Sequence, residues 1–470
     1  MSKLTLARAI CIAVFGAATA IAASAQTFAS LLDFAGSNGA GSSASLLQAE
    51  DGKLYGSTGV GGADSVGTIF KVSTRGVLRS IHGFDVTDGA YPAASLAQAN
   101  NGAFYGTTIL GGANGWGSVF KITPDGTLTT LYSFCSQSNC PDGSYLYGGL
   151  VQGTDGSFYG ATGAGGATGD GTIFKITPQG VLITLHDFDY ADGYEPFATL
   201  IQGNDGSFYG TTSAGGLYGS GTVFKVTASG VLTTLHSFDS TDGVNLDSPL
   251  LQASNGSFYG TTQEAGSGNG GTVFKITPSG ILTTLYSFCS LIDCADGSGP
   301  HGGLVEATDG NFYGTTLYGG LNGHCASSDT AGCGTIFEIN PDGVLTTLHV
   351  FDSTDGANPS AGLLQDTNGN FYGTTQDGGA FNDGTVFSLS TGLRPFVKLQ
   401  PTFGKAGTPV IIMGTNLATA TGVSFNGTAA TFKAISSAIE TTVPAGATTG
   451  TVEVTMPGGT LSSNVVFRVK

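Results

Sequence analysis

Carboxylate side chains recur at fixed places in this 470-residue sequence. The motif Asp-x-(Thr/Ala)-Asp-Gly occurs four times, and its second aspartate is Asp88, Asp192, Asp242 or Asp355. Such a pair predicts either a calcium site, because Ca²⁺ prefers oxygen ligands, or a turn in which aspartate accepts backbone N–H groups. The spacing differs from the Asp-x-Asp-x-Asp-Gly of a calcium loop, so we expect the turn, with no metal and no cofactor.

Aromatic side chains accompany these carboxylates in segments predicted to be loops. Flat amphipathic rings beside carboxylates suit sugar rings, which they bind by stacking and hydrogen bonding, although such rings also fill space beneath loops. The candidate ligand-binding residues are therefore Trp116, Tyr91, Tyr145, Tyr147, Tyr190, Tyr194, Tyr218 and Tyr318, with the aspartates Asp88, Asp192, Asp242 and Asp355. Trp116, the sole tryptophan in the sequence, is the first residue to mutate.

Histidine placement gives little support for catalysis. Four of the six histidines occupy one repeated position, as His82, His186, His236 and His349, and Tyr132 and Tyr286 fill that position elsewhere. A position that accepts either residue predicts a structural role. Many loop aspartates match the two carboxylates of a glycosidase by chance, so we single out no catalytic residue.

Internal repetition explains why these residues recur. The tetrapeptide Tyr-Gly-(Ser/Thr/Ala)-Thr has spacings of 50, 54, 50, 50, 54 and 59 residues, beginning at Tyr55, Tyr105, Tyr159, Tyr209, Tyr259, Tyr313 and Tyr372. Each longer interval contains a cysteine-bearing insertion, so the underlying period is 50 residues.

Each unit contains four strand-like runs separated by turn residues. In the fourth copy these runs are 199–202, 208–212, 222–226 and 231–238, and Asp205-Gly206 predicts a two-residue type I′ turn after the first. Four strands per unit in seven copies predict an all-β fold, a seven-bladed β-propeller.

The two ends of the repeat array complement each other. The seventh unit lacks a fourth strand, and residues 28–34 supply an orphan copy of it. We therefore expect a propeller closed by the N-terminal strand, which removes an exposed sheet edge. A linear solenoid with capping repeats is the alternative.

The repeated unit resembles a known family. The pattern Asp-Gly-x-Phe-Tyr-Gly-Thr-Thr…Gly-Thr-Val-Phe-Lys-Ile…Gly-x-Leu-Thr-Thr-Leu is similar to the tandem repeat of the bacterial GloVer repeat proteins, across residues 28–392. The resemblance implies an exported bacterial protein with a variable C-terminal module. It implies no activity.

A different module follows the repeats. Short strand-like runs with Gly and Pro between them occupy residues 393–470 and predict a small immunoglobulin-like β-sandwich. Segments 401–417, 423–427 and 443–454 resemble an IPT/TIG domain, which implies a spacer or interaction module. The expected domains are thus a signal peptide at 1–25, the propeller at 26–392 and the IPT/TIG domain at 393–470.

Residues 1–25 have the features of a secretory signal. Lys3 and Arg8 precede an apolar run, and Ala23-Ser24-Ala25 is a small-x-small cleavage site; a membrane anchor is the alternative, disfavoured by the short run. Loss of Lys3 and Arg8 changes the formal charge from −17 to −19, which disfavours nucleic acid and anionic membranes as partners. We expect a monomer that is secreted or otherwise extracytoplasmic, with no membrane span in the mature chain.

The cysteines support export. Cys11 leaves with the signal, and the remaining six of the seven form close pairs, which are Cys135/Cys140, Cys289/Cys294 and Cys325/Cys333. An even count in an exported chain predicts disulfides. A zinc site is the alternative, but these spacings differ from the usual ligand spacing.

Chain order divides the connections between two faces. Connections from first to second and from third to fourth strand are tight turns on one face, the tight-turn face. The other connections carry every cysteine pair and most loop aromatics, and they form the loop-bearing face. Because binding residues concentrate on variable loops, we expect a non-catalytic binding or scaffold protein that meets polysaccharide or another envelope component there. A polysaccharide hydrolase or lyase, or a purely structural spacer, is the alternative.

Overall fold

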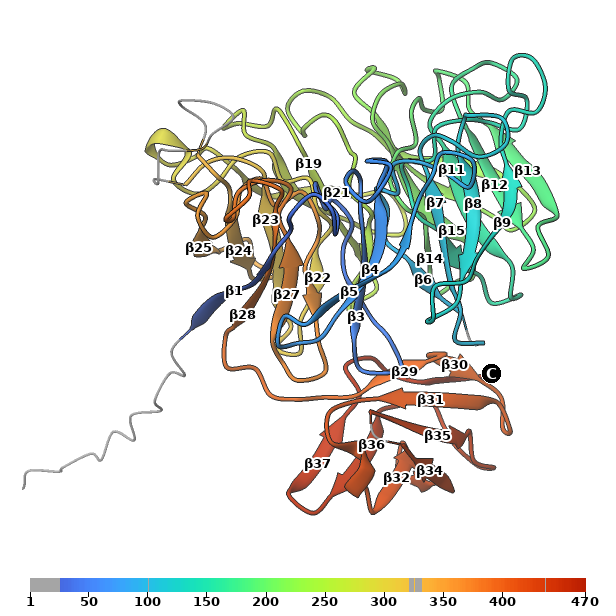
Figure 1. The fold of residues 1–470 in the computed structure, drawn as a ribbon, viewed down its shortest axis with the longest axis vertical. Helices are drawn as coiled ribbons and strands as arrows, with labels where there is room; N and C mark the ends of the chain where they lie inside the picture. The colour runs from blue at the N-terminus through green and yellow to red at the C-terminus, as the bar shows by residue number, and fades with distance from the viewer. Residues whose placement is uncertain (1–25, 100, 321–324, 326–331, 436) are drawn as a thin grey trace, which may run out of the picture.

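The computed structural model describes residues 26–99, 101–320, 325, 332–435 and 437–470. The predicted signal peptide at 1–25 lies outside these residues. The fold is all-β, and the helical turns in the described segments are η1 (Ile292–Cys294) and η2 (Leu417–Thr419). Figure 1 shows a large body of upright strands, the repeat body, with a smaller C-terminal module beneath it.

Within the described residues, the repeat body contains seven antiparallel sheets of four strands each. The first strands are two residues long: β2 Leu47–Gln48, β6 Ala97–Gln98, β10 Val151–Gln152, β14 Ile201–Gln202, β18 Leu251–Gln252, β22 Val305–Glu306 and β26 Leu364–Gln365. The second strands are β3 Leu54–Thr58, β7 Phe104–Thr108, β11 Phe158–Thr162, β15 Phe208–Thr212, β19 Phe258–Thr262, β23 Phe312–Thr316 and β27 Phe371–Thr374.

The outer half of each sheet is longer. The third strands are β4 Thr68–Val72, β8 Ser118–Ile122, β12 Thr172–Ile176, β16 Thr222–Val226, β20 Thr272–Ile276, β24 Thr335–Ile339 and β28 Thr385–Ser390. The fourth strands are β5 Leu78–Gly83, β9 Leu128–Ser133, β13 Leu182–Asp187, β17 Leu232–Ser237, β21 Leu282–Ser287 and β25 Leu345–Val350, with β1 Thr27–Asp33 in this position beside β28.

The Tyr-Gly-Thr motif sits where the sheets pack most closely. Second strands are buried along their whole length. In β15, Phe208 packs against the third sheet and Tyr209 against the fifth. The glycine permits this packing: a Cβ on Gly210 would lie 2.6 Å from Leu200 Cδ2 and 2.7 Å from Phe224 Cζ. Any larger residue would force these core side chains apart.

Aromatic rings join each sheet to the next. Tyr55 contacts Phe104 with ring centroids 4.3 Å apart, and the equivalent pair Tyr209–Phe258 lies at 4.2 Å. At the junction of the seventh sheet with the first, Leu54 takes the place of the phenylalanine, and Tyr372 and Val386 share one core cluster with it. The hydrophobic core is therefore continuous between the seventh sheet and the first.

Two further contacts link the seventh sheet to the start of the chain. Strand β1 pairs with β28, with Phe28 opposite Leu389, as the orphan copy of the fourth strand predicts. The side chain of Gln48 donates to Thr367 Oγ1 over 2.8 Å and accepts from Thr367 N. Equivalent side-chain to backbone bonds join Gln98 to Glu50 and Gln202 to Thr154, so inner-strand glutamines act as links between sheets.

The turns between first and second strands differ from the predicted type I′. In the fourth sheet Gly206 N donates to Gly203 O and Gly203 N donates to Ser207 O. Gly206 has a positive φ of 82°, whereas Asp205 lacks the positive φ that a type I′ turn also requires there. The result is a type I turn followed by a left-handed glycine, a three-residue hairpin. The prediction was wrong because Asp205 serves contacts across the sheet: its carboxylate accepts from Tyr209 Oη at 3.0 Å and pairs with Lys225 at 2.7 Å.

In the described part of the C-terminal module there are two four-stranded sheets and one strand pair. One sheet has the order β29 (Lys398–Gln400), β31 (Pro409–Met413), β35 (Ala438–Thr442), β34 (Phe432–Ala434). The other has the order β33 (Thr428–Ala429), β32 (Gly422–Phe425), β36 (Val452–Met456), β37 (Gly459–Ser462). Strands β30 (Phe403–Gly404) and β38 (Arg468–Val469) pair in parallel, and both sheets contribute to a core containing Ile412 and Phe425.

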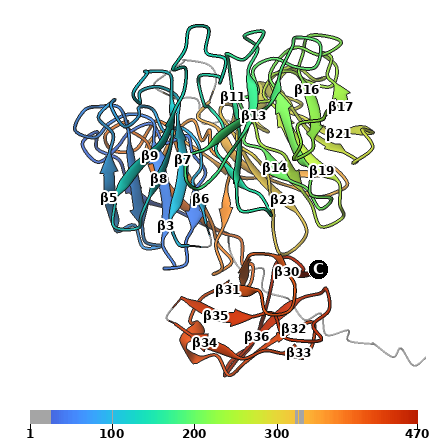
Figure 2. The same ribbon diagram turned by 90° about the vertical axis from the view of Figure 1, so that its right-hand side faces the viewer.

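The C-terminal module docks on the tight-turn face of the repeat body (Figures 1 and 2). Ser437 Oγ donates to Glu50 O over 2.8 Å, and Gln400 Nε2 donates to Gln98 O over 2.8 Å. Lys398 Nζ donates to Gln365 O over 2.6 Å. The module therefore rests on the first, second and seventh sheets.

The seventh sheet is adapted to this contact. Asp366 is buried at a position where the other sheets have alanine or glycine, which are Ala49, Ala99, Gly153, Gly203, Ala253 and Ala307. Burial raises the pKa of Asp366, and the Lys398 ammonium opposes the rise. Burial likewise lowers the pKa of Lys398 to about 8, against the attraction of Asp366. Two buried ionisable groups that influence each other electrostatically thus lie at the seam between the two parts of the chain.

Three disulfides confirm the predicted cysteine pairing, Cys135–Cys140, Cys289–Cys294 and Cys325–Cys333. In the part of the chain that the structure covers, no helix is long and apolar enough to cross a membrane.

Candidate functional site

The repeated histidines pair with the aspartates of the Asp-x-(Thr/Ala)-Asp-Gly loops. His82 Nε2 lies 2.7 Å from Asp88 Oδ2, and His236 Nε2 lies 2.9 Å from Asp242 Oδ2. The same contact joins His186 to Asp192 and His349 to Asp355. Where tyrosine replaces histidine, Tyr132 Oη donates to Asp142 over 2.8 Å. The side chain from the fourth strand therefore anchors the loop that follows it.

The aspartates of each loop also hold their own turn. Asp88 Oδ1 accepts from Asp85 N, and Asp85 Oδ1 accepts from Thr87 Oγ1 and Thr87 N. The Thr87 hydroxyl bond lowers the pKa of Asp85. These carboxylates are thus engaged within the loop, as an aspartate-initiated turn requires. Among the described residues, no group of three or more His, Cys, Asp or Glu is arranged to hold a metal ion.

Seven equivalent residues, each two places after the glycine of this loop, share a left-handed backbone. Four of them are Gly41, Asn245, Gly299 and Asn358, the residue types that adopt this conformation most readily. The other three are consecutive: Tyr91 (φ 59°), Tyr145 (φ 59°) and Glu195 (φ 57°). Bulky side chains held at positive φ are backbone outliers, and such outliers concentrate at functional sites.

Several aromatic rings lie around Tyr145 and Glu195. Trp116 and Tyr145 meet edge to face with ring centroids 5.2 Å apart, and Tyr147 contacts Phe197 at 4.5 Å. The backbone holds the first pair together, because Tyr145 N donates to Trp116 O. We call Trp116, Tyr145, Tyr147 and Phe197, with Glu195, the aromatic cluster.

The aromatic cluster combines accessible rings with a carboxylate. The exposed fractions are 40% for Trp116 and 42% for Tyr147, values at which a ring is held on one side and open on the other. Partial burial raises the pKa of Tyr147, with smaller contributions from Tyr145 and Glu195. A hydrogen bond to Glu195, together with burial, raises the pKa of Tyr194. Rings and a carboxylate within reach of one another suit a hydroxylated ring ligand.

The aromatic cluster breaks the sequence symmetry of the repeats. The residues equivalent to Tyr147 and Phe197 in the other connections are small or polar, namely Ser43, Ala93, Asp247, His301 and Ser360. Phe197 was missing from the sequence-based candidates, although its occupation of the Tyr147 position was a usable signal. Tyr147 and Phe197 come from two adjacent connections, those that lead into the third and fourth sheets. One side of the loop-bearing face therefore differs from the rest.

Of the other predicted ligand-binding residues, Tyr194 borders the aromatic cluster through its hydrogen bond to Glu195. Tyr190 and Tyr194 contact each other at 6.2 Å, while Tyr218 is 61% exposed in the loop of the fourth sheet. Tyr318 lies in a loop of the sixth sheet. Tyr91 lies in the connection between the first and second sheets, where its backbone is left-handed. Asp88, Asp192, Asp242 and Asp355 are the histidine-paired loop anchors described above.

Two family models match the chain. The model described as Gloeobacter/Verrucomicrobia repeat matches residues 13–145, 136–328 and 295–432. The IPT/TIG domain model matches residues 396–469. Both agree with the resemblances in the sequence. No curated protein matches the chain.

Several solved structures are similar to the chain at low sequence identity. A putative 6-phosphogluconolactonase from Bacteroides fragilis is 18% identical, with 68% of this chain and 85% of that chain covered and a TM-score of 0.44. Kuenenia stuttgartiensis hydrazine synthase is 14% identical, with 75% and 97% covered and a TM-score of 0.48. The periplasmic gluconolactonase of Pseudomonas aeruginosa is 14% identical, with 70% and 93% covered and a TM-score of 0.42.

Proposed function

Because the chain belongs to the Gloeobacter/Verrucomicrobia repeat family and carries an IPT/TIG domain, we propose that it is a non-catalytic binding protein. Its repeats form the scaffold, and the loop-bearing face meets the ligand. The ligand class is a polysaccharide, such as a component of a cell envelope. The aromatic cluster is the contact surface.

The scaffold in this proposal is a closed seven-bladed β-propeller at residues 26–392, followed by an immunoglobulin-like sandwich at 393–470. Closure is supported by β1 as the fourth strand beside β28, and by the core that Tyr372 shares with Leu54. A closed ring leaves no free sheet edge and holds its loops on a rigid frame. On such a frame, the loops on one side of the loop-bearing face can differ in sequence from the others while the fold is kept.

One observation carries the binding proposal: the aromatic cluster occupies positions that are glycine, asparagine or small residues in most other repeats. A purely structural role would favour the same unstrained residue in every repeat. Tyr145 and Glu195 instead keep left-handed backbones, and their neighbours Tyr147 and Phe197 contribute rings to the same place. Local strain that supplies accessible rings is expected of a recognition site.

Export completes the proposal. Residues 1–25 act as a cleaved signal, and the mature protein is a monomer that is secreted or located at the cell surface. Three disulfides support this assignment, since such bonds persist in oxidising compartments.

Retention on a panel of insoluble polysaccharides tests the proposal. We expect at least one polysaccharide to retain the protein, and Trp116→Ala to weaken retention about tenfold, since loss of a stacked ring costs roughly 1.5 kcal/mol. Tyr318→Ala is the matched control, because Tyr318 is a loop aromatic of similar exposure, 39%. Equal loss in both variants, or no retention by any polysaccharide, would contradict the proposal.

A further inference from the structure

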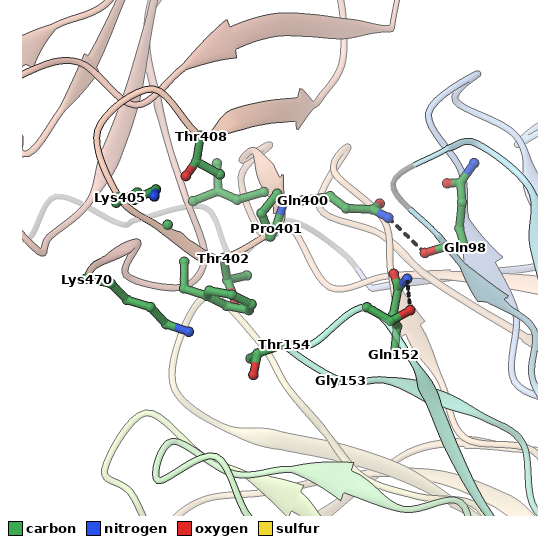
Figure 3. Close-up of a pocket in the computed structure, with 14 residues that line it drawn as sticks. Gln98, Gln152, Gly153, Thr154, Gln400, Pro401, Thr402, Lys405, Thr408 and Lys470 are labelled. Carbon is green, nitrogen blue, oxygen red and sulfur yellow. Dashed lines mark hydrogen bonds between the residues drawn. The ribbon is translucent and has the colours of Figure 1, made fainter. Parts of the chain in front are cut away.

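A cleft lies between the C-terminal module and the third sheet of the repeat body (Figure 3). Its volume is about 570 Å³, within the range of small-molecule sites, which occur preferentially where domains meet. The cleft exists because the module rests on the first, second and seventh sheets through Glu50, Gln98 and Gln365. The module leaves the turn between β10 and β11 uncovered, and this turn forms one wall of the cleft.

The two walls of the cleft have different chemistry. The repeat body contributes carboxamide and hydroxyl groups from Gln152 and Thr154. The module contributes Lys405 and Lys470, together with the ring of Phe403. Lys470 Nζ lies 4.2 Å from the Phe403 ring centroid, a cation–π contact that holds the ammonium at the cleft wall. Figure 3 shows the lysines on the side opposite Gln152.

The side chains that line the cleft carry a charge opposite in sign to the net charge of the protein. The chain has 33 acidic and only 16 basic residues, yet the cleft lining contains two lysines and no carboxylate side chain. Within the described residues, neither Lys405 nor Lys470 forms an ion pair, whereas Lys175, Lys225 and Lys433 do. Two unpaired cations in one cleft of an acidic protein are available to an anionic ligand.

We infer that this cleft binds an oligosaccharide that carries carboxylates, of the uronic acid type. The ammonium groups neutralise the carboxylates, while Thr154, Thr402 and Thr408 offer hydrogen bonds to sugar hydroxyls. Gln152 Nε2 already donates to Gly156 O. The cleft is separate from the aromatic cluster, which is on the opposite face of the repeat body. The inference therefore stands independently of the function proposed for the loop-bearing face.

Calorimetric titration of the full chain with trigalacturonic acid, and with a neutral trisaccharide as comparison, tests the inference. We expect saturable binding of the acidic sugar at least tenfold tighter than that of the neutral one, and a tenfold or greater loss in the K405Q/K470Q double variant. K433Q is the matched control, because Lys433 lies on the same module but pairs with Glu440 at 3.3 Å. Its affinity should equal that of the unmodified chain.

Tryptophan emission separates this cleft from the other face. Trp116 is the only tryptophan and belongs to the aromatic cluster, so binding in the cleft leaves its emission unchanged. Three outcomes would overturn the inference: no binding of trigalacturonate, equal affinity in K405Q/K470Q, or full competition by equimolar acetate, which would show recognition of charge alone. A shift in Trp116 emission on binding would also overturn it, by placing the sugar on the loop-bearing face.

Discussion

At the residue scale, Tyr145 combines a strained backbone with a half-buried aromatic ring in the aromatic cluster. Its φ of 59° is one that asparagine and glycine adopt at the equivalent positions Asn245 and Gly299. Tyr145→Asn should therefore leave the unfolding free energy unchanged or raise it by up to roughly 1 kcal/mol. The melting temperature should change in the same direction. The same variant should lose polysaccharide retention.

The paired control for this variant is Tyr91→Asn. Tyr91 has the same φ of 59° but lies outside the aromatic cluster, so its replacement should match the thermal effect and keep retention. Thermal unfolding and retention measured on both variants distinguish a recognition role from a packing role. A strongly destabilised Tyr145→Asn would mean that the ring is held for packing.

The histidine of the fourth strand gives a second prediction at this scale. His236 contacts Asp242, and tyrosine makes the equivalent contact where Tyr132 meets Asp142. His236→Tyr should preserve the unfolding free energy within about 0.5 kcal/mol, whereas His236→Ala should lower it by about 1–2 kcal/mol through the lost hydrogen bond. Chemical denaturation provides the values, and equal losses in both variants would refute the anchoring role.

At the element scale, strand β1 fastens the last sheet to the first. Phe34, directly after β1, is fully buried in the core cluster that includes Phe70 and Tyr372. Phe34→Ala should lower the unfolding free energy by about 3–5 kcal/mol, because it leaves a cavity at this junction. Val77→Ala, at a site that is 73% exposed, should have little effect. A small loss for Phe34→Ala in denaturant titration would mean that β1 contributes little to closure.

Much of this element-scale structure could be predicted from sequence. In the fourth sheet, strands 208–212 and 222–226 are as predicted, because Gly-rich turns delimit them clearly. The first strand is Ile201–Gln202 instead of 199–202, since pairing with β15 involves just two residues. Turn type was mispredicted because Asp205 serves Tyr209 across the sheet, a contact that local turn rules do not include.

At the scale of the whole molecule, the relation between module and repeat body was beyond sequence rules. Asp366 was a readable signal, because it alone replaces alanine or glycine among seven equivalent positions. Lys398, whose charge acts on Asp366, comes from another fold unit, so spacing along the chain gave no hint that the two groups lie near each other. The cleft beside Lys405 depends on the docking angle and was likewise invisible in the sequence.

The seam predicts a pH effect on the whole chain. The pKa of Lys398 is about 8 in the folded chain, below its ordinary 10.5, so the unfolded state holds more protons between these values. Unfolding free energy therefore rises with pH in this window. Relative to Lys398→Met, the unmodified chain should gain stability from pH 8 to pH 10, measured by denaturant titration. Parallel pH curves for the two proteins would contradict the desolvated state of Lys398.

Trp116 emission offers the most direct test of a binding site on the loop-bearing face. Titration with soluble fragments of a polysaccharide that retains the protein should change the emission saturably, since Trp116 is the only tryptophan and is 40% exposed in the aromatic cluster. Tyr145→Asn should abolish the change. Tight binding of such fragments with unaltered Trp116 emission would contradict the account.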